Sequence, residues 1–153
     1  MNELKVALFL FSSLLSTFGT LAQASEEQEV QNALVGNYLE ALKSTMHGKS
    51  SAEDILLLTE LYATNVIYEH PGIGIKLETK EVISKGLLSF LGSYGGEKEG
   101  TQIKILNQIF GKGRSTVEFE IKFRTSDGKS ISRKQVQVLE FKDQQIRRII
   151  DYW

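Results

Sequence analysis

Histidine is the residue type best suited to acid–base chemistry near neutral pH, and this chain of 153 residues has only two, His47 and His70. Imidazole has an ordinary pKa of about 6.5, so it can take up or release a proton under physiological conditions. Pro71 follows His70 and favours extended geometry at the residue before it, while lacking an N–H donor itself. We therefore expect His70 at the end of a strand over residues 64–70, where a pocket could open.

Metal, cofactor and phosphate chemistry are not expected. The chain has no cysteine, which excludes disulfides, thiolate catalysis and cysteine-based metal sites. The two histidines lack metal-ligand spacing, and Glu69 and His70, as strand neighbours, should point to opposite faces. The segment 111–114 predicts a hairpin turn rather than a phosphate-binding loop. The formal net charge of −1 gives no general attraction to nucleic acid or to an anionic membrane surface.

Helical periodicity dominates the first half of the chain. Apolar residues at three- and four-residue spacing predict a helix over residues 25–47. A second, short helix is expected to begin with a capping box of Ser50 and Glu53, and a third helix to begin after Thr79. The glycine-containing segment 73–76 is expected to form a loop.

From residue 101 onward, the hydrophobic period changes to two. Apolar side chains at positions 117, 119, 121 and 123 alternate with charged ones, which is typical of a half-buried antiparallel strand. The pattern predicts strands over residues 101–110, 114–125, 129–141 and 145–153. Three helices, one early strand and this meander predict an α+β domain in which the helices pack on one face of a strongly curved, mostly antiparallel sheet. Such a sheet encloses a cone-shaped interior.

The first 24 residues have the layout of a secretory signal peptide. Lys5 precedes an apolar run over residues 6–21, and Ala22 and Ala24 place small residues before a very polar segment. The run is short and polar for a membrane span. We expect cleavage after Ala24 and export to a periplasm or to the exterior. The mature domain would cover residues 25–153 and would have no stable membrane association.

Three segments together resemble the SnoaL-like branch of the nuclear transport factor 2-like superfamily: Leu61–Pro71, the Asp127–Gly128 hairpin and Ile146–Trp153. The resemblance covers essentially all of residues 25–153. It implies a cystatin-like, cone-shaped α+β barrel. Steroid Δ-isomerases, polyketide cyclases and limonene-epoxide hydrolases are enzymes of this fold, which also includes many non-catalytic proteins.

The motif match is best with the steroid isomerases. In those enzymes a tyrosine of the first helix donates to the developing oxyanion, and Tyr38 matches it. Their general-base aspartate corresponds to His70, and a protonated aspartate that donates a second hydrogen bond corresponds to Gln137. A tryptophan beside the base corresponds to Trp153. Because both carboxyl groups are replaced, the resemblance implies the place of a site and not isomerase activity.

The resemblance also implies which faces of the last two strands point inward. The inward-facing residues would be Arg133, Gln135, Gln137, Leu139 and Phe141 from one strand, and Arg147, Ile149, Asp151 and Trp153 from the other. Polar groups that converge inside an apolar interior are typical of a ligand site. The alternative register would place Val136 and Val138 inward and leave no pocket. In the preferred register these two valines lie on an outer face that could form a homodimer.

Two functions therefore stay open. In the first, an exported domain binds a small hydrophobic or amphipathic molecule, with His70 as a base, Asp151 supporting its charged form and Tyr38 as a donor. The other ligand-binding residues would be Gln137, Trp153, Tyr68, Gln135, Leu139 and Ile149. In the second, the chain is a non-catalytic interaction or dimerisation module that uses its outer sheet face.

Overall fold

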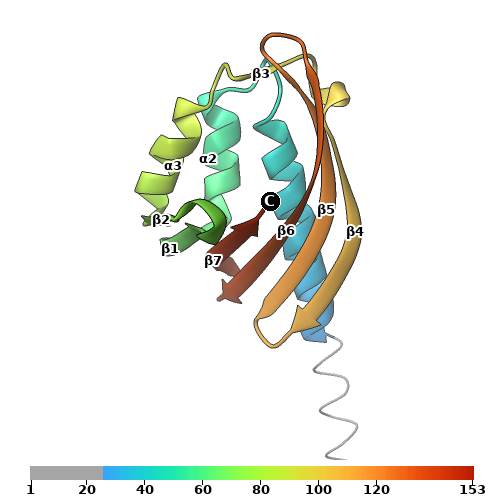
Figure 1. The fold of residues 1–153 in the computed structure, drawn as a ribbon. Coiled ribbons are helices and arrows are strands. Elements are labelled where there is room, and N and C mark those ends of the chain that lie inside the picture. Colours follow the sequence, from blue (N-terminus) through green and yellow to red (C-terminus); the bar gives the residue numbers. More distant parts are fainter. Residues whose placement is uncertain (1–25) are drawn as a thin grey trace, which may run out of the picture.

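The computed structural model describes residues 26–153, so the predicted signal segment and Ser25 lie outside it. The first helix runs over residues 26–44, α2 over Ala52–Glu60 and α3 over Lys80–Ser89. These helices lie on the concave side of a curved sheet (Figure 1). Within the described residues, no helix is long and apolar enough to cross a membrane.

Seven strands and two short 3-10 turns make up the rest of the described fold. The strands are β1 Tyr62–His70, β2 Ile75–Glu78, β3 Tyr94–Gly95, β4 Gln102–Gly111, β5 Arg114–Thr125, β6 Ser130–Lys142 and β7 Gln145–Tyr152. The turns are η1 Pro71–Ile73 and η2 Lys98–Gly100. The predicted α+β class is therefore confirmed, and the long strands of the meander lie within about one residue of their predicted bounds.

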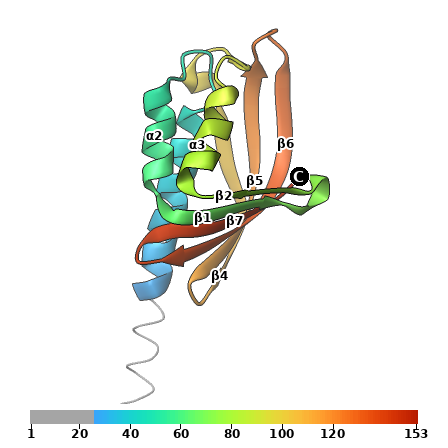
Figure 2. The same ribbon diagram turned by 90° about the vertical axis from the view of Figure 1, so that its left-hand side faces the viewer.

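The strands form one sheet in the order β2-β1-β7-β6-β5-β3, with β4 also paired to β5. Every pairing is antiparallel except that between β1 and β7. The parallel pairing brings the end of β1 beside the end of β7, although more than 80 residues separate them. Figure 2 shows the C-terminal end of the chain beside the turn that joins β1 and β2.

The core lies between the helices and the concave face of the sheet. Its buried members come from both layers and include Val35, Leu39, Leu58, Val66, Phe119, Ile121, Leu139, Ile146 and Ile149. Each strand contributes alternate side chains, as the two-residue period requires. Removing such side chains from water supplies most of the stabilisation of the fold.

The cap of α2 differs from its prediction by one residue. Ser51 is the N-cap, and its amide donates to Asp54 Oδ2 at 2.8 Å in a capping box. Ser50 instead accepts a hydrogen bond from the His47 amide at 3.0 Å and donates to the Ser44 carbonyl at 3.0 Å. Both serines have suitable chemistry, so the tertiary path of the turn decided which one became the cap.

Two short strands were missed by the sequence patterns. β2 begins inside the predicted loop over residues 73–76. Gly74 adopts a left-handed φ of 69°, after which the chain reverses and β2 pairs antiparallel with β1. β3 pairs Gly95 with Arg124, and a Cβ on Gly95 would collide with the Thr125 carbonyl oxygen. Strands of two to four residues carry too little periodicity to be recognised from sequence.

The predicted register of β6 is confirmed. Gln135, Gln137 and Leu139 are buried on the concave side, whereas Val136 and Val138 lie on the outer face. The prediction for Arg147 is wrong, since this side chain is exposed and ion-paired with Glu140. The reason is a register shift between Glu140 and Phe141, which places one extra residue in β7. As a result, the side chains that point inward from β7 do not strictly alternate along the strand.

Candidate functional site

His70 is the last residue of β1, and its side chain is buried on the concave side. Its exposed fraction is 2%, yet neither ring nitrogen has a hydrogen-bond partner among the described residues. Val66 and Tyr68 precede it on the same face, as strand alternation requires. The backbone turns sharply after it through Pro71, and a Cβ on Gly72 would lie 3.3 Å from His70 Cε1. The turn therefore packs directly against the imidazole.

Trp153 covers His70 from the end of β7. The two rings meet edge to face, with centroids 4.5 Å apart and planes at 90°. Unlike His70, the tryptophan is 55% exposed and lies just outside the strand. Its indole therefore packs on the buried imidazole while remaining partly exposed to solvent.

Asp151 lies deeper in the same region, one pleat before Trp153 on β7. Its carboxylate accepts a hydrogen bond from the Tyr68 hydroxyl at 3.1 Å and is 3.5 Å from Gln135 Nε2. Burial raises the pKa of Asp151 above its ordinary value, while the side chains of Gln137, Tyr68 and His70 act in the opposite direction. Burying the charged form of the Asp151 carboxylate therefore costs free energy.

Tyr38 approaches this group from the first helix. It is buried, and its pKa is raised well above its ordinary value by burial and by the nearby Tyr62 and Asp151. Hydrogen bonding to the side chain of Gln137 acts in the opposite direction. Tyr38 therefore remains a protonated donor, and Gln137 Oε1 remains a buried acceptor without a partner.

The structure brings most of the predicted site residues together. His70, Asp151, Tyr38, Gln137, Gln135, Tyr68 and Trp153 all face one region of the concave side. Leu139 and Ile149 belong to the apolar core cluster beneath it. No hydrogen bond joins His70 to Asp151, because both ring nitrogens are unpartnered and the carboxylate pairs with Tyr68.

Arg133 is the site residue to which the sequence patterns assigned no role. Its guanidinium carbon lies 4.6 Å from the ring centroid of Trp153 and 5.7 Å from that of Phe123. The signal was present, because Arg133 alternates with Gln135 and Gln137 on the same face of β6. Among residues 26–153, four of the six buried side-chain polar atoms without a partner belong to this site: both nitrogens of His70, Gln137 Oε1 and Arg133 Nε.

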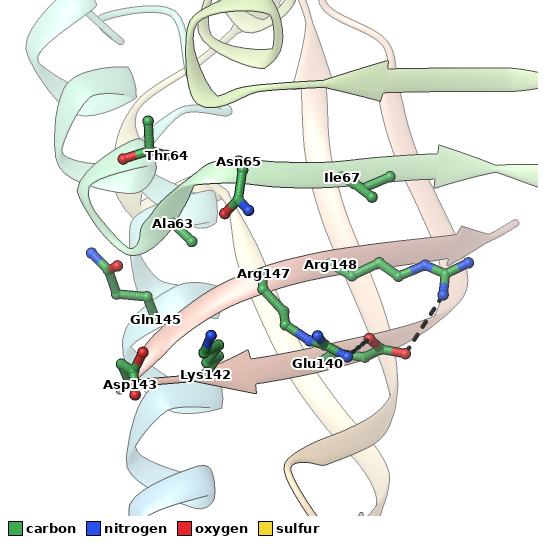
Figure 3. Close-up of a pocket in the computed structure, with 10 residues that line it drawn as sticks. All are labelled: Ala63, Thr64, Asn65, Ile67, Glu140, Lys142, Asp143, Gln145, Arg147 and Arg148. Carbon is green, nitrogen blue, oxygen red and sulfur yellow. Dashed lines mark hydrogen bonds and ion pairs between the residues drawn. The ribbon is translucent and has the colours of Figure 1, made fainter.

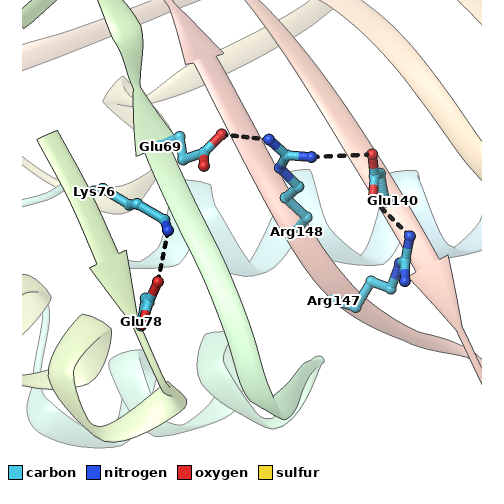
Figure 4. A network of polar contacts seen from close by, with 6 residues as sticks. All are labelled: Glu69, Lys76, Glu78, Glu140, Arg147 and Arg148. Atoms are coloured by element: carbon cyan, nitrogen blue, oxygen red, sulfur yellow. Dashed lines mark hydrogen bonds and ion pairs between the residues drawn. The ribbon is translucent and has the colours of Figure 1, made fainter. Parts of the chain in front are cut away.

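A hollow lies on the opposite, outer face of the sheet. It has a volume of about 500 Å³ and is lined by Ala63, Thr64, Asn65, Ile67, Glu140, Lys142, Asp143, Gln145, Arg147 and Arg148 (Figure 3). Most of its charges already pair. Arg148 contacts Glu69 at 2.7 Å and Glu140 at 3.7 Å, and Arg147 contacts Glu140 at 2.9 Å (Figure 4). The unsatisfied groups are concentrated on the concave side instead.

Within residues 26–153, no three histidine, aspartate or glutamate side chains converge in a way that could hold a metal ion. His70 Nδ1 and Nε2 both remain open to another partner. The groups present can accept a proton, donate hydrogen bonds and contact an apolar molecule.

Comparison with known proteins identifies the fold but no near relative. No family model matches the chain, and no curated protein matches it. An epoxide hydrolase from Mycobacterium tuberculosis that resembles limonene-epoxide hydrolase superposes with a TM-score of 0.64 at 18% identity, covering 83% of this chain and 84% of that one. A nuclear transport factor 2-like protein of unknown function from Burkholderia pseudomallei gives 0.62 at 16% identity, covering 81% and 90%.

A third structure carries a small ligand. It is a hypothetical protein from Catenulispora acidiphila with a ketosteroid isomerase-like fold, in complex with trimethylamine. Its TM-score is 0.54 at 17% identity, covering 65% of this chain and 74% of that one. The chain therefore has the cone-shaped fold of the nuclear transport factor 2-like superfamily, as its sequence predicted.

Proposed function

We propose that this protein binds a small hydrophobic or amphipathic molecule on the concave side of its sheet, beneath Trp153. The observation that carries the proposal is the pair of unpartnered nitrogens of the buried His70. A buried polar group without a partner costs about 1–3 kcal/mol, so native proteins nearly always supply one. A bound molecule that hydrogen-bonds to the imidazole and to Gln137 Oε1 would remove this cost.

The surroundings suit a molecule that is partly apolar. Leu139 and Ile149 provide aliphatic surface beneath the polar groups, and Trp153 and Tyr68 provide aromatic surface around them. Entry requires Trp153 to swing away, which its position outside β7 and its exposed ring allow. The trimethylamine complex of the Catenulispora acidiphila protein supports small-molecule binding by a protein of this fold.

We infer that His70 is the base in any proton transfer within this site. A neutral imidazole can accept a proton from a bound molecule, and the nearby carboxylate of Asp151 would stabilise the imidazolium that results. Tyr38 and Gln137 would donate hydrogen bonds to an oxygen that gains negative charge. The epoxide hydrolase of the same fold shows only that this architecture can house catalysis, because the fold does not determine the reaction.

Mass spectrometry tests the binding proposal directly. The full chain is expressed, the secreted or periplasmic protein is purified, and its bound small molecules are extracted and identified. Wild-type protein should retain a specific molecule, whereas His70→Phe should lose it while remaining folded. His47→Asn is the matched control, because His47 is a buried histidine outside the site. Equal retention by wild type and His70→Phe would contradict the proposal.

Export through a cleaved signal peptide is a further part of this proposal. It rests on the charged, apolar and small-residue regions of residues 1–24. The intact mass of the secreted protein should correspond to a chain that begins at Ser25. A mass that includes residues 1–24 would contradict it.

Homodimerisation is a second candidate function, favoured by the outer face of the sheet. Ile109, Thr116, Val138 and Ile150 are direct cross-strand partners from β4 to β7, which makes a largely apolar row across the sheet. Ile109 is 62% exposed. Val138→Lys should convert a dimer to a monomer in size-exclusion chromatography with light scattering, whereas Gln102→Lys on the same sheet should not. A monomeric wild type would exclude this role.

A further inference from the structure

Arg133 lies at the edge of the proposed site, between two aromatic rings. Its side chain projects from the concave face of β6, and its guanidinium lies over Trp153 at 4.6 Å and near Phe123 at 5.7 Å. Tyr94 contacts Phe123 edge to face, with ring centroids 5.4 Å apart. The guanidinium is therefore held by aromatic surface on more than one side, which fixes its position.

This arginine has no anionic partner within residues 26–153. Arg147 and Arg148 each pair with a glutamate at 2.9 Å or less, but no carboxylate lies within ion-pair distance of Arg133. Arg133 Nε is also buried without a hydrogen-bond partner. Stacking uses the faces of a guanidinium, so its in-plane N–H donors remain available to an acceptor.

The neighbouring hydroxyl groups belong to Tyr68 and Tyr94. Burial raises the pKa of both tyrosines, Asp151 contributes further to that of Tyr68, and the positive charge of Arg133 acts in the opposite direction on each. Both phenols therefore stay protonated at neutral pH. Both hydroxyl groups lie close enough to Arg133 for its positive charge to act on their pKa.

We propose that Arg133 binds the anionic group of the ligand, and that the ligand is an elongated amphipathic carboxylic acid. This inference rests on the proposed function, and it names the chemical class that the site takes. A planar guanidinium with free in-plane donors matches the two oxygens of a carboxylate. The aromatic rings that hold the guanidinium would contact the apolar carbons next to the carboxylate.

The charges of the site also set the orientation of the ligand. Arg133 and Gln137 are four residues apart on β6, so about 13 Å of strand separates their backbones, and the Arg133 guanidinium lies over Trp153. Asp151 is the direct cross-strand partner of Gln137 and would repel an anion placed at the deep end. The carboxylate therefore stays at Arg133, and the uncharged end extends toward His70.

Three matched probes test this inference: phenylhexanoate, phenylhexanamide and phenylhexylamine. Each is titrated into uniformly ¹⁵N-labelled full-length protein, and the indole N–H signal is followed. The chain has a single tryptophan, so this signal reports on Trp153 without ambiguity. The acid should bind about tenfold or more tightly than the amide, since hydrogen bonds to charged groups contribute about 1.5–3 kcal/mol. The amine should bind most weakly.

Variants assign the preference to Arg133. Arg133→Gln should abolish the difference in affinity between acid and amide. Arg133→Lys should retain part of the preference, because it keeps the charge but not the planar donor pair. Arg124→Gln removes an exposed arginine from β5 and should leave the preference intact.

The possible failures are distinguishable. Equal binding of acid and amide by the wild type, or tighter binding of the amine, would overturn the carboxylate assignment and leave the proposed binding function standing. An acid preference that survives in Arg133→Gln would overturn the role of Arg133. Absence of any indole shift with all three probes would count against the proposed function and against this inference together.

Discussion

The indole of Trp153 meets the imidazole of His70 edge to face, with ring centroids 4.5 Å apart. One ring is more than half exposed and the other is almost fully buried. The single tryptophan of the chain is therefore in direct contact with the group that we propose as the base. This contact makes Trp153 a spectroscopic reporter on the site.

Asp151→Asn should stabilise the protein at pH 7. Burial raises the pKa of Asp151 in the folded state, so folding favours its protonated form. The wild type therefore loses stability as pH rises from the ordinary value of 3.8 through the raised folded-state pKa, and an asparagine loses none. Tyr68 can still donate to the asparagine carbonyl oxygen.

Denaturant unfolding at several pH values measures this effect. The gain in unfolding free energy of Asp151→Asn over wild type should be largest at neutral pH and should shrink as pH falls toward 3.8. Asp143→Asn is the control, because it makes the same substitution at a side chain that is exposed in the turn before β7. A loss of stability in Asp151→Asn at pH 7 would mean that its hydrogen bonds outweigh the cost of burying its charge.

Sequence patterns were sufficient for most of this fold because its long elements have strong periods. β5 alternates apolar and polar residues over its whole length, and its bounds matched the prediction. Tertiary geometry decided what the patterns missed. The extra residue in β7 that turns Arg147 outward has no local signature, and neither do the short strands β2 and β3.

Sequence reasoning predicted which of these side chains share the concave side, but not how they pair. Alternation together with the family resemblance placed His70, Gln137 and Asp151 on inward faces, and the fold brings those faces together. Which polar atoms pair depends on distances of a few tenths of an ångström, which sequence does not carry. Tyr68 rather than His70 pairs with Asp151. That the His70 imidazole has no hydrogen-bond partner among the described residues could be found only from the structure.

Gln31→Leu should destabilise the fold by about 2 kcal/mol, because it would leave buried polar groups without partners. Gln31 Nε2 donates to the Gly111 carbonyl and to Glu27 Oε1, each at 3.0 Å, and its Oε1 accepts from Ser115 Oγ at 3.1 Å. These bonds fasten the first helix to the turn between β4 and β5. Asn32→Leu, at the exposed neighbouring position, should change the unfolding free energy by less than about 0.5 kcal/mol. Similar values for both variants would show that the network contributes nothing.

Gly95→Ala should be much more destabilising than Gly74→Ala. Glycine is needed at position 95 because another strand packs closely there, and at position 74 because of its backbone conformation. A Cβ at Gly74 would meet open space, so only the left-handed φ of 69° is unfavourable, at a cost of about 1 kcal/mol. A Cβ at Gly95 would instead collide with the backbone oxygen of Thr125, and neither strand can withdraw without breaking the β3–β5 pairing. We expect a loss of about 3 kcal/mol or more in thermal or denaturant unfolding. Equal losses in the two variants would show that β3 moves freely away from β5.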